Sequence, residues 1–298
     1  MSFVARQQFS WQLRTRSLSL GERTRVMAIV NLTPDSFSGD GLSGKGLDAA
    51  IAAAVAAVDA GADLIDLGAE STRPGSEPVQ PHEEQRRLLP VLEGLLKQRP
   101  EAIVSIDTYH ASTALEAAQC GAEIINDVSG FTWDEGMADA VLRTGCGLVL
   151  MHTYGRPSEW RTQPALGADA VLDAVIRGLS EQLGRALNAG IRRESIVLDP
   201  GFGFGKVGEE NFTLLAGLDR LQSFECALLI GLSRKGFFAP VVKQLQPEGL
   251  SVPESRRIAT AAANVAAVLA GAHLVRVHDV QQTREAVAVA DAILAGRV

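Results

Sequence analysis

Eight short apolar segments of the 298-residue chain each end in a polar residue that could bind a ligand or take part in catalysis. Carboxylates, amides and cationic groups of this kind could together hold a heterocycle with several N–H donors and a phosphate group. A sheet gains no stability from so many polar strand ends, so we expect one pocket to collect these side chains. In chain order they are Asn31, Glu70, Asp107, Asn126, His152, Asp199, Ser233 and the pair Arg276 and His278.

Two carboxylates and an amide follow neighbouring segments, in the sequences VSID, IIND and IVLD, as Asp107, Asn126 and Asp199. A single Asp before a turn is usually a cap for the backbone. Three acceptors together exceed what capping requires, and buried carboxylates need partners, so we expect a donor-rich ligand such as a guanine-like ring. A lone histidine is usually a satisfied core residue, and this is our interpretation of His152 and His273.

The last segment contains Arg276 and His278, which a strand would place on one face because they lie two residues apart. Val275 and Val277 alternate with them and are apolar, as positions that face outer helices should be. We therefore expect the arginine and the histidine to point inward. A phosphate or pyrophosphate would be a suitable counterion there.

Two long loops carry further candidate residues. The first segment runs into NLTPDSFS, where the Asn31 amide could ligate a hard cation or hydrogen-bond a phosphate. The second loop contains ESTRPG, over Glu70–Gly75. Its Arg73 could cap the loop, or it could clamp an anion as part of a lid.

The sequence GFGFGK over Gly201–Lys206 invites a nucleotide-loop interpretation, which its spacing excludes. It matches neither GxGxxG nor GxxxxGK[ST], because Val207 follows the lysine and Pro200 stands where the first glycine belongs. We interpret this segment as a tight loop that bends Phe202 and Phe204 over the mouth of the pocket.

The segments that carry these residues are predicted to be parallel strands covered on both faces, because their Val, Ile and Leu runs are continuous. Helical stretches rich in Ala, Leu, Glu and Arg separate them, at 47–60, 82–98, 112–120, 170–189 and 256–270. Glycines in left-handed conformation should end four of these helices, at positions 61, 121, 190 and 271. The expected strands are Val26–Asn31, Leu64–Gly68, Ile103–Asp107, Ile124–Val128, Leu148–His152, Ile196–Asp199, Leu228–Ser233 and Leu274–Asp279.

Eight such units could form a closed (β/α)8 TIM barrel or a large open sheet. The barrel is favoured because the polar residues are spread over all eight strands, whereas an open sheet gathers them at a switch point. Alternating residues over Phe9–Leu20 predict a β-hairpin that closes the bottom. We expect an α/β fold with one domain over 1–298, of which 1–25 form the hairpin extension.

Composition excludes several classes of partner. Net charge is −7 and no cluster of five or more basic residues occurs, so we expect no nucleic acid partner. No window approaches the ~20 apolar residues of a membrane span. The three cysteines are far apart and odd in number, which indicates neither a disulfide framework nor a thiolate metal site. We expect a cytoplasmic protein.

The motifs resemble one family specifically, the dihydropteroate synthases, which belong to the pterin-binding barrels. Any one motif could arise by chance, but eight in the family's order could hardly do so, and the match runs nearly end to end. The matching segments are Asn31–Ser38, Glu70–Gly75, Ser105–Thr108, Ile125–Val128, Met151–His152, Asp199–Lys206, Ser233–Lys235 and Arg276–Val280.

The resemblance implies condensation of a dihydropterin hydroxymethyl pyrophosphate with p-aminobenzoate, in an Mg²⁺-dependent homodimer that sulfonamides target. Asp107, Asn126, Met151, Asp199, Lys235 and Arg276 would hold the pterin. Asn31, Thr72, Arg276 and His278 would hold the pyrophosphate, with Mg²⁺ at Asn31. The aminobenzoate would lie between Arg73, Pro74, Phe204 and Ser233. The catalytic residues implied are Asn31, Asp35, Arg73, Lys235, Arg276 and His278.

Two rival functions remain open from the sequence. A methyltetrahydrofolate-corrinoid methyltransferase would share the barrel and the pterin acceptors, but it has no use for a pyrophosphate clamp such as Arg276 and His278. A paralogue that binds pterin without catalysis should lack Asn31, Arg73 or Lys235, and all three are present.

Overall fold

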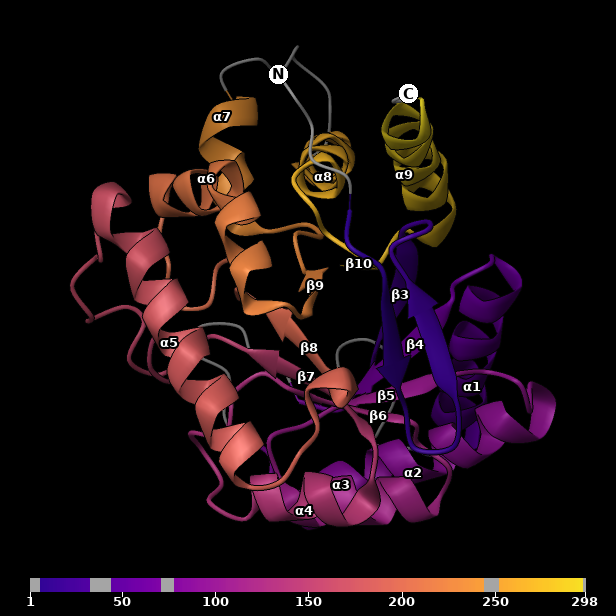
Figure 1. Cartoon of the computed structure of the whole chain (residues 1–298). Coiled ribbons are helices and arrows are strands. Elements are labelled where there is room, and N and C mark those ends of the chain that lie inside the picture. Colours follow the sequence, from indigo (N-terminus) through magenta and orange to yellow (C-terminus); the bar gives the residue numbers. More distant parts are fainter. Residues whose placement is uncertain (1–5, 33–43, 71–77, 244–251, 297–298) are drawn as a thin grey trace.

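Eight parallel strands close into a barrel, as the sequence predicts. The computed structural model describes residues 6–32, 44–70, 78–243 and 252–296. Strand β10 pairs with β3 and completes the ring, and helices surround it (Figure 1). The strands are β3 (Arg25–Asn31), β4 (Leu64–Gly68), β5 (Val104–Asp107), β6 (Ile124–Asp127), β7 (Gly147–Met151), β8 (Ile196–Asp199), β9 (Ala227–Ile230) and β10 (Leu274–Val277).

Helices follow the strands, and four of them end where glycine was predicted to end them. Gly61, Gly121, Gly190 and Gly271 have φ values of 89°, 106°, 92° and 107°, a left-handed region that costs glycine little. No described helix is long and apolar enough to cross a bilayer. The helices are α1 (Gly44–Asp59), α2 (Pro81–Gln98), α3 (Ala111–Gln119), α4 (Met137–Thr144), α5 (Ala168–Asn188), α6 (Glu209–Ala216), α7 (Ala239–Lys243), α8 (Val252–Leu269) and α9 (Val280–Ala295).

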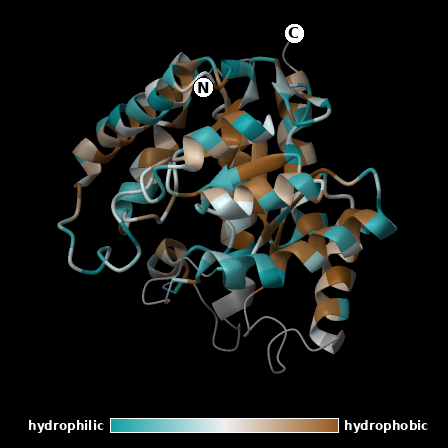
Figure 2. Cartoon of the chain, turned by 90° about the horizontal axis from the view of Figure 1, so that it is seen from below, coloured by the Kyte–Doolittle hydropathy of each residue, from teal (hydrophilic) through white to brown (hydrophobic). Residues whose placement is uncertain are grey.

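Successive side chains of the strands enter two different cores. Leu64, Val149 and Leu274 point into the barrel near its bottom. Their neighbours, such as Leu150 and Val275, pack outward against the helices. The barrel strands are therefore mostly hydrophobic, whereas the surrounding helices carry both hydrophobic and hydrophilic residues (Figure 2).

The predicted hairpin closes the bottom of the barrel. Strands β1 (Phe9–Gln12) and β2 (Ser17–Leu20) are antiparallel, and Trp11 and Leu20 belong to the core inside the barrel. The indole of Trp11 donates to the carbonyl of Ser195 over 2.9 Å. A Cβ at Gly147 would come within 2.8 Å of Leu13 Cδ2, so the hairpin and the start of β7 are in close contact.

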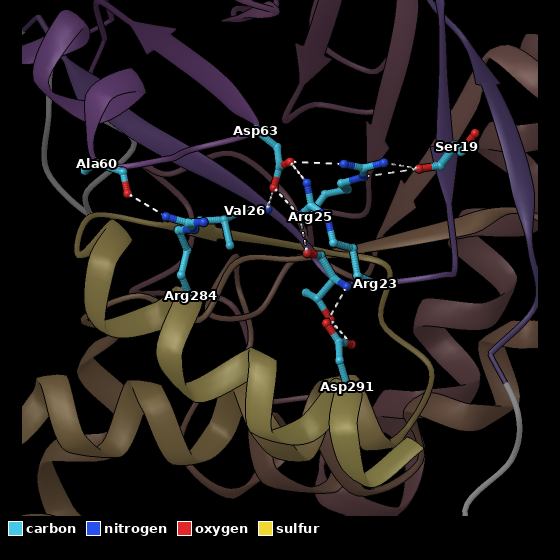
Figure 3. A network of polar contacts seen from close by, with 9 residues as sticks. Ser19, Arg23, Arg25, Val26, Ala60, Asp63, Arg284 and Asp291 are labelled. Atoms are coloured by element: carbon cyan, nitrogen blue, oxygen red, sulfur yellow. Dashed lines mark hydrogen bonds and ion pairs between the residues drawn. The ribbon is translucent and has the colours of Figure 1, made fainter. Parts of the chain in front are cut away.

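A network of polar contacts around Asp63 and Asp291 connects residues at the bottom of the barrel (Figure 3). Asp63 pairs with Arg23 and, over 3.1 Å, with Arg25, and it accepts from the Val26 N–H over 2.9 Å. Burial alone would raise the pKa of Asp63, but these donors outweigh it and lower the pKa below its usual value. This carboxylate therefore stabilises the fold at neutral pH.

Several polar residues predicted to end strands lie beyond them instead. Strand β9 stops at Ile230, so Ser233 lies three residues farther on, and His152 and His278 each follow a finished strand. Glu70 likewise lies two residues beyond β4. The short strands leave these backbones free to turn across the mouth of the barrel, which a longer strand would not allow.

Candidate active site

A charged cluster forms the floor of the open end of the barrel. Arg276 on β10 reaches across the interior, where Nε lies 2.6 Å from Asp66 Oδ2 and Nη2 lies 2.5 Å from Asp107 Oδ2. The Asn126 amide also donates to Asp66 Oδ2, over 3.1 Å. These four residues come from four different strands, which confirms that Arg276 points inward.

The two carboxylates predicted to bind a ligand have raised pKa values. Burial, together with Asp66 and Glu70, raises the pKa of Asp107 to about 7, although Arg276 opposes the shift. Burial raises the pKa of Asp199 to about 6, against the Gly201 N–H, which donates to Oδ1 over 2.7 Å. Among the described residues no donor reaches the other oxygen of either carboxylate. Both therefore retain capacity for a donor-rich ligand.

Lys235, Phe204 and Met151 form the wall beside this floor. Lys235 Nζ lies 4.3 Å from the centre of the Phe204 ring, a cation–π distance. Burial lowers the pKa of this lysine to about 8, although the Asp199 carboxylate raises it in part. Met151 packs with Phe204, so an apolar surface and a cation face the acceptors.

A turn around Arg234 brings Ser233 and His278 together. Arg234 adopts φ of 57°, which is rare for a residue with a side chain, and its guanidinium pairs with Asp279 over 2.8 Å. Ser233 Oγ lies 2.9 Å from His278 Nδ1 and accepts from the His278 N–H over 3.1 Å. Burial, with the nearby Arg234 and Arg276, lowers the pKa of His278 to about 4, so the ligand-free imidazole is neutral.

The GFGFGK loop is organised by a buried lysine, not by a phosphate. Lys206 Nζ donates to the carbonyls of Gly201, Phe204 and His152 over 2.8, 3.3 and 3.4 Å. Burial lowers the pKa of Lys206 to about 7. The prediction that two aromatics cover the pocket is wrong for Phe202, which lies in the outer core, and only Phe204 belongs to the wall.

Several predicted residues lie outside the described residues, and Asp127, next to Asn126 on β6, lies away from the pocket. Asp35, Thr72, Arg73 and Pro74 fall in ranges that the structure does not describe. Asp127 points away from the barrel interior and caps the N–H groups of Ser129 and Phe131, over 2.8 Å each.

The two histidines assigned to the core differ. His273 is satisfied, since Nδ1 accepts from the Leu228 N–H over 3.1 Å and Nε2 lies 3.0 Å from the carbonyl of Gln7. His152 is buried, but its Nδ1 has no partner in the described part of the chain, so the expectation of a fully paired residue is wrong there.

Asn31 is the one described residue for which a metal role was predicted. It ends β3 at the open end of the barrel, and an amide oxygen there suits a hard cation. The described residues include no cluster of three acidic, histidine or cysteine side chains that could hold a metal by themselves. Proteins commonly bind Mg²⁺ through one or two oxygens together with substrate phosphates.

Asp66 is the residue of this site that the sequence interpretation left without a role. Its signal was available, because a charged residue stands in the middle of the apolar strand LIDLG, two positions from Gly68. Period two places Asp66 on the interior face, where it is fully buried. Tyr109 was also missed; its hydroxyl donates to Glu70 over 2.8 Å beside the pocket.

Comparisons with known proteins agree with this geometry. A family model described as "Pterin binding enzyme" matches residues 27–278. The dihydropteroate synthase of Escherichia coli K12 is 41% identical over 272 residues, covering 91% of this chain and 92% of that protein.

Solved structures show the same likeness. The Yersinia pestis dihydropteroate synthase with a sulfonamide drug complex has a TM-score of 0.85 at 38% identity, covering 97% of this chain and 100% of that one. The Xanthomonas albilineans dihydropteroate synthase with 4-aminobenzoic acid has a TM-score of 0.84 at 39% identity, covering 96% and 99%. The chain therefore belongs to the pterin-binding enzyme family, among the dihydropteroate synthases, which are transferases that make dihydropteroate.

Proposed function

We propose that this pocket joins a dihydropterin hydroxymethyl pyrophosphate to p-aminobenzoate and releases pyrophosphate. The observation that carries the proposal is the excess of buried acceptors at the open end of the barrel. Among the described residues, the cations near Asp66, Asp107 and Asp199 are Arg276, Lys235 and Lys206. Each carboxylate still keeps one oxygen without a hydrogen-bond donor from these residues, so the cluster suits a ligand that donates hydrogen bonds. A pterin edge, with its amino and ring N–H groups, supplies them.

The pterin would lie with its polar edge toward Asp107, Asn126 and Asp199. The described geometry supports this placement, since these side chains come from β5, β6 and β8 and enter one interior. Met151 would pack near the ring, with Arg276 stacking on it and Lys235 at its polar edge.

The pyrophosphate would lie at the Arg276 and His278 end of the pocket, with Asn31 and Thr72 as further ligands. The His278 imidazole is neutral, and Ser233 contacts its Nδ1. The other ring nitrogen, Nε2, can therefore accept a hydrogen bond from the substrate or donate one to it. A dianionic group beside His278 would raise its pKa and favour a charged imidazolium. Mg²⁺ bound at Asn31 would supply charge neutralisation for the leaving group.

The aminobenzoate would enter beside Phe204 and Ser233, with Arg73 and Pro74 completing its site. Phe204 offers apolar surface to the benzene ring, and Lys235 lies over the Phe204 ring as a cation. The Xanthomonas albilineans relative solved with 4-aminobenzoic acid supports this substrate class. The Yersinia pestis complex with a sulfonamide drug supports the proposal that sulfonamides bind here too.

The chemistry then follows from charge. The bond between the pterin methylene carbon and the pyrophosphate oxygen breaks, and its electron pair leaves with the pyrophosphate. The electron-rich pterin delocalises the methylene cation, the aniline nitrogen donates its lone pair to form the new C–N bond, and that nitrogen then loses a proton. Asp35, Arg73 and Lys235 would complete the catalytic set. The cysteine thiols take no part, since they lie at the opposite end of the barrel. Cys120 follows α3 ahead of β6, and Cys146 and Cys226 lie just before β7 and β9.

The test is incubation of the purified protein with the dihydropterin pyrophosphate, p-aminobenzoate and Mg²⁺, following dihydropteroate and pyrophosphate. Asp199→Ala should abolish product. The matched control is Asp63→Ala, which removes a carboxylate at the other end of the barrel and should leave activity in the folded protein. Pterin binding without product would favour a non-catalytic paralogue, and absence of pterin binding would overturn the proposal.

We also propose that two copies pair through the late helices. Ile258 on α8 and Val289 and Ile293 on α9 are exposed apolar residues, at 71%, 60% and 42%, on two helices that pack together. Covering them would remove apolar surface from water. Sedimentation analysis of Ile258→Glu against the parent would test this. A cytoplasmic location and a single domain over 1–298 stay predictions.

A further inference from the structure

One carboxylate oxygen of Asp66 accepts two hydrogen bonds. Its Oδ2 accepts from Arg276 Nε over 2.6 Å and from Asn126 Nδ2 over 3.1 Å. The side chain is fully buried, and Oδ1 has no hydrogen-bond partner among the described residues. A buried carboxylate that fixes two donors limits the rotamers of both, because moving Arg276 would leave buried charges unpaired and moving Asn126 would leave a buried amide donor unpaired.

Arg276 divides its donors between a fully buried partner and a more accessible one. Asp66 is 0% exposed at its side chain, whereas Asp107 is 16% exposed and Arg276 is 17% exposed. By the proposed function Asp107 offers its oxygens to the pterin, and the contact with Arg276 occupies one of them, Oδ2. The Asp66 contact lies deeper and has no such conflict.

We propose that Asp66 is a positioning residue that holds Arg276 and Asn126 in place for the pterin, so that Asp107 is released to bind the substrate. This rests on the proposed roles of Asn126 and Arg276. Asp66 does not touch the reacting atoms. Without the charge of Asp66, the guanidinium of Arg276 keeps Asp107 as its ion-pair partner among the described residues. A pterin donor that binds Oδ2 of Asp107 must then break that pair.

The test is a double-mutant cycle on pterin affinity, with 6-hydroxymethylpterin as the probe and calorimetry as the readout. Asp66→Asn keeps the side-chain shape and removes the charge, and Arg276→Met removes the partner. We expect Asp66→Asn to weaken pterin binding about 10- to 100-fold in the parent, the range for a hydrogen bond to a charged group. In the Arg276→Met background it should cost less than about 3-fold, the part carried by Asn126.

The matched control is Ser105→Ala. Ser105 is paired with Asp66 across β4 and β5, is fully buried, and its Oγ has no hydrogen-bond partner in the described part of the chain. It should bind the pterin like the parent. Asp66→Ser is a second variant that removes the charge, in case Asp66→Asn does not fold. The melting temperature of each variant shows whether it is folded, and only folded variants are compared with the parent.

A structural role would give a different pattern. Equal losses of affinity from Asp66→Asn with and without Arg276, or parent-like affinity in folded Asp66→Asn and Asp66→Ser, would overturn the proposal. Steady-state kinetics adds a second criterion: KM for the pterin substrate should rise, with KM for p-aminobenzoate changing less than about 3-fold. A parent protein that binds no pterin would overturn the proposed function and this inference with it, which separates the two failures.

Discussion

The two ends of the barrel both bury carboxylates beside arginines, yet the pKa values move in opposite directions. At the bottom, donors from Arg23, Arg25 and the Val26 backbone outweigh burial and lower the pKa of Asp63. At the open end, burial prevails and raises the pKa of Asp107 and Asp199 to about 7 and about 6. The carboxylate at the bottom is paired with donors and stabilises the fold, whereas the carboxylates at the open end have fewer hydrogen-bond donors than they can accept.

The arginines show the same difference. Arg6 is buried at the bottom and donates to Gly21, Thr24, Ala272 and Asp291, over 2.6 to 3.1 Å. Arg276 makes two ion pairs, and one of them uses a carboxylate proposed for the substrate. Arg6 is therefore fully paired within the chain, whereas Arg276 shares one of its partners with the proposed ligand.

The largest expected effect is on activity at the open end. Asp199→Asn should lower kcat/KM for the pterin substrate about 100- to 1,000-fold. A neutral amide cannot replace the one or two charge-assisted hydrogen bonds that the carboxylate would accept from the pterin. Steady-state assays would measure this. Asp63→Asn is the matched control, and an equal loss in both variants would show that the two ends do not differ in function.

Removal of the Lys206 charge should have the next largest effect, on stability. Lys206→Met leaves three carbonyls without their donor, and we expect a loss of roughly 2–4 kcal/mol in the free energy of unfolding. Urea denaturation would measure it. Arg220→Met removes an exposed pair with Asp173 and should cost roughly 0–1 kcal/mol, so a comparable loss there would contradict the special role of Lys206.

Asp63→Asn should cost roughly 1–2 kcal/mol at pH 7, since its paired charge is lost. The sign of the pH dependence follows from the lowered pKa. The charge stabilises the fold above the ordinary pKa of 3.8, and this contribution disappears as the pH falls below that value toward the folded-state pKa. Urea denaturation at pH 7 and near pH 3 would measure the free energies of unfolding of Asp63→Asn and the parent. The difference between them should be smaller near pH 3, and an equal difference at both pH values would contradict the prediction.

Much of this arrangement could be predicted from the sequence. Apolar runs indicated the strands, glycines indicated the helix ends, and period two placed Arg276 inward, because these signals depend on local geometry alone. The prediction that both aromatics of the GFGFGK loop cover the pocket failed for Phe202. Gly201, Gly203 and Gly205 have φ values of 67°, 78° and 73°, so Phe202 turns into the outer core while Phe204 faces the pocket.

The partners of charged residues could not be predicted in the same way. Asp66 and Arg276 are 210 positions apart, and their contact depends on the closure of the barrel. The same holds for Ser233 and His278, which meet because β9 ends early and Arg234 turns the chain. Sequence spacing indicates that a residue faces the interior, but it does not indicate which neighbours it finds there.

The most direct test compares the free energies of unfolding of ligand-free Asp199→Asn and Asp63→Asn with the parent at pH 8. The pKa of Asp199 is raised from 3.8 to about 6, so the folded protein binds the proton more tightly than the unfolded chain, and the ionised carboxylate costs stability above pH 6. We predict that Asp199→Asn is more stable than the parent by about 1–2 kcal/mol, a gain that fades toward pH 4, while Asp63→Asn is less stable. Destabilisation by both substitutions would contradict the claim that the open end is left short of donors.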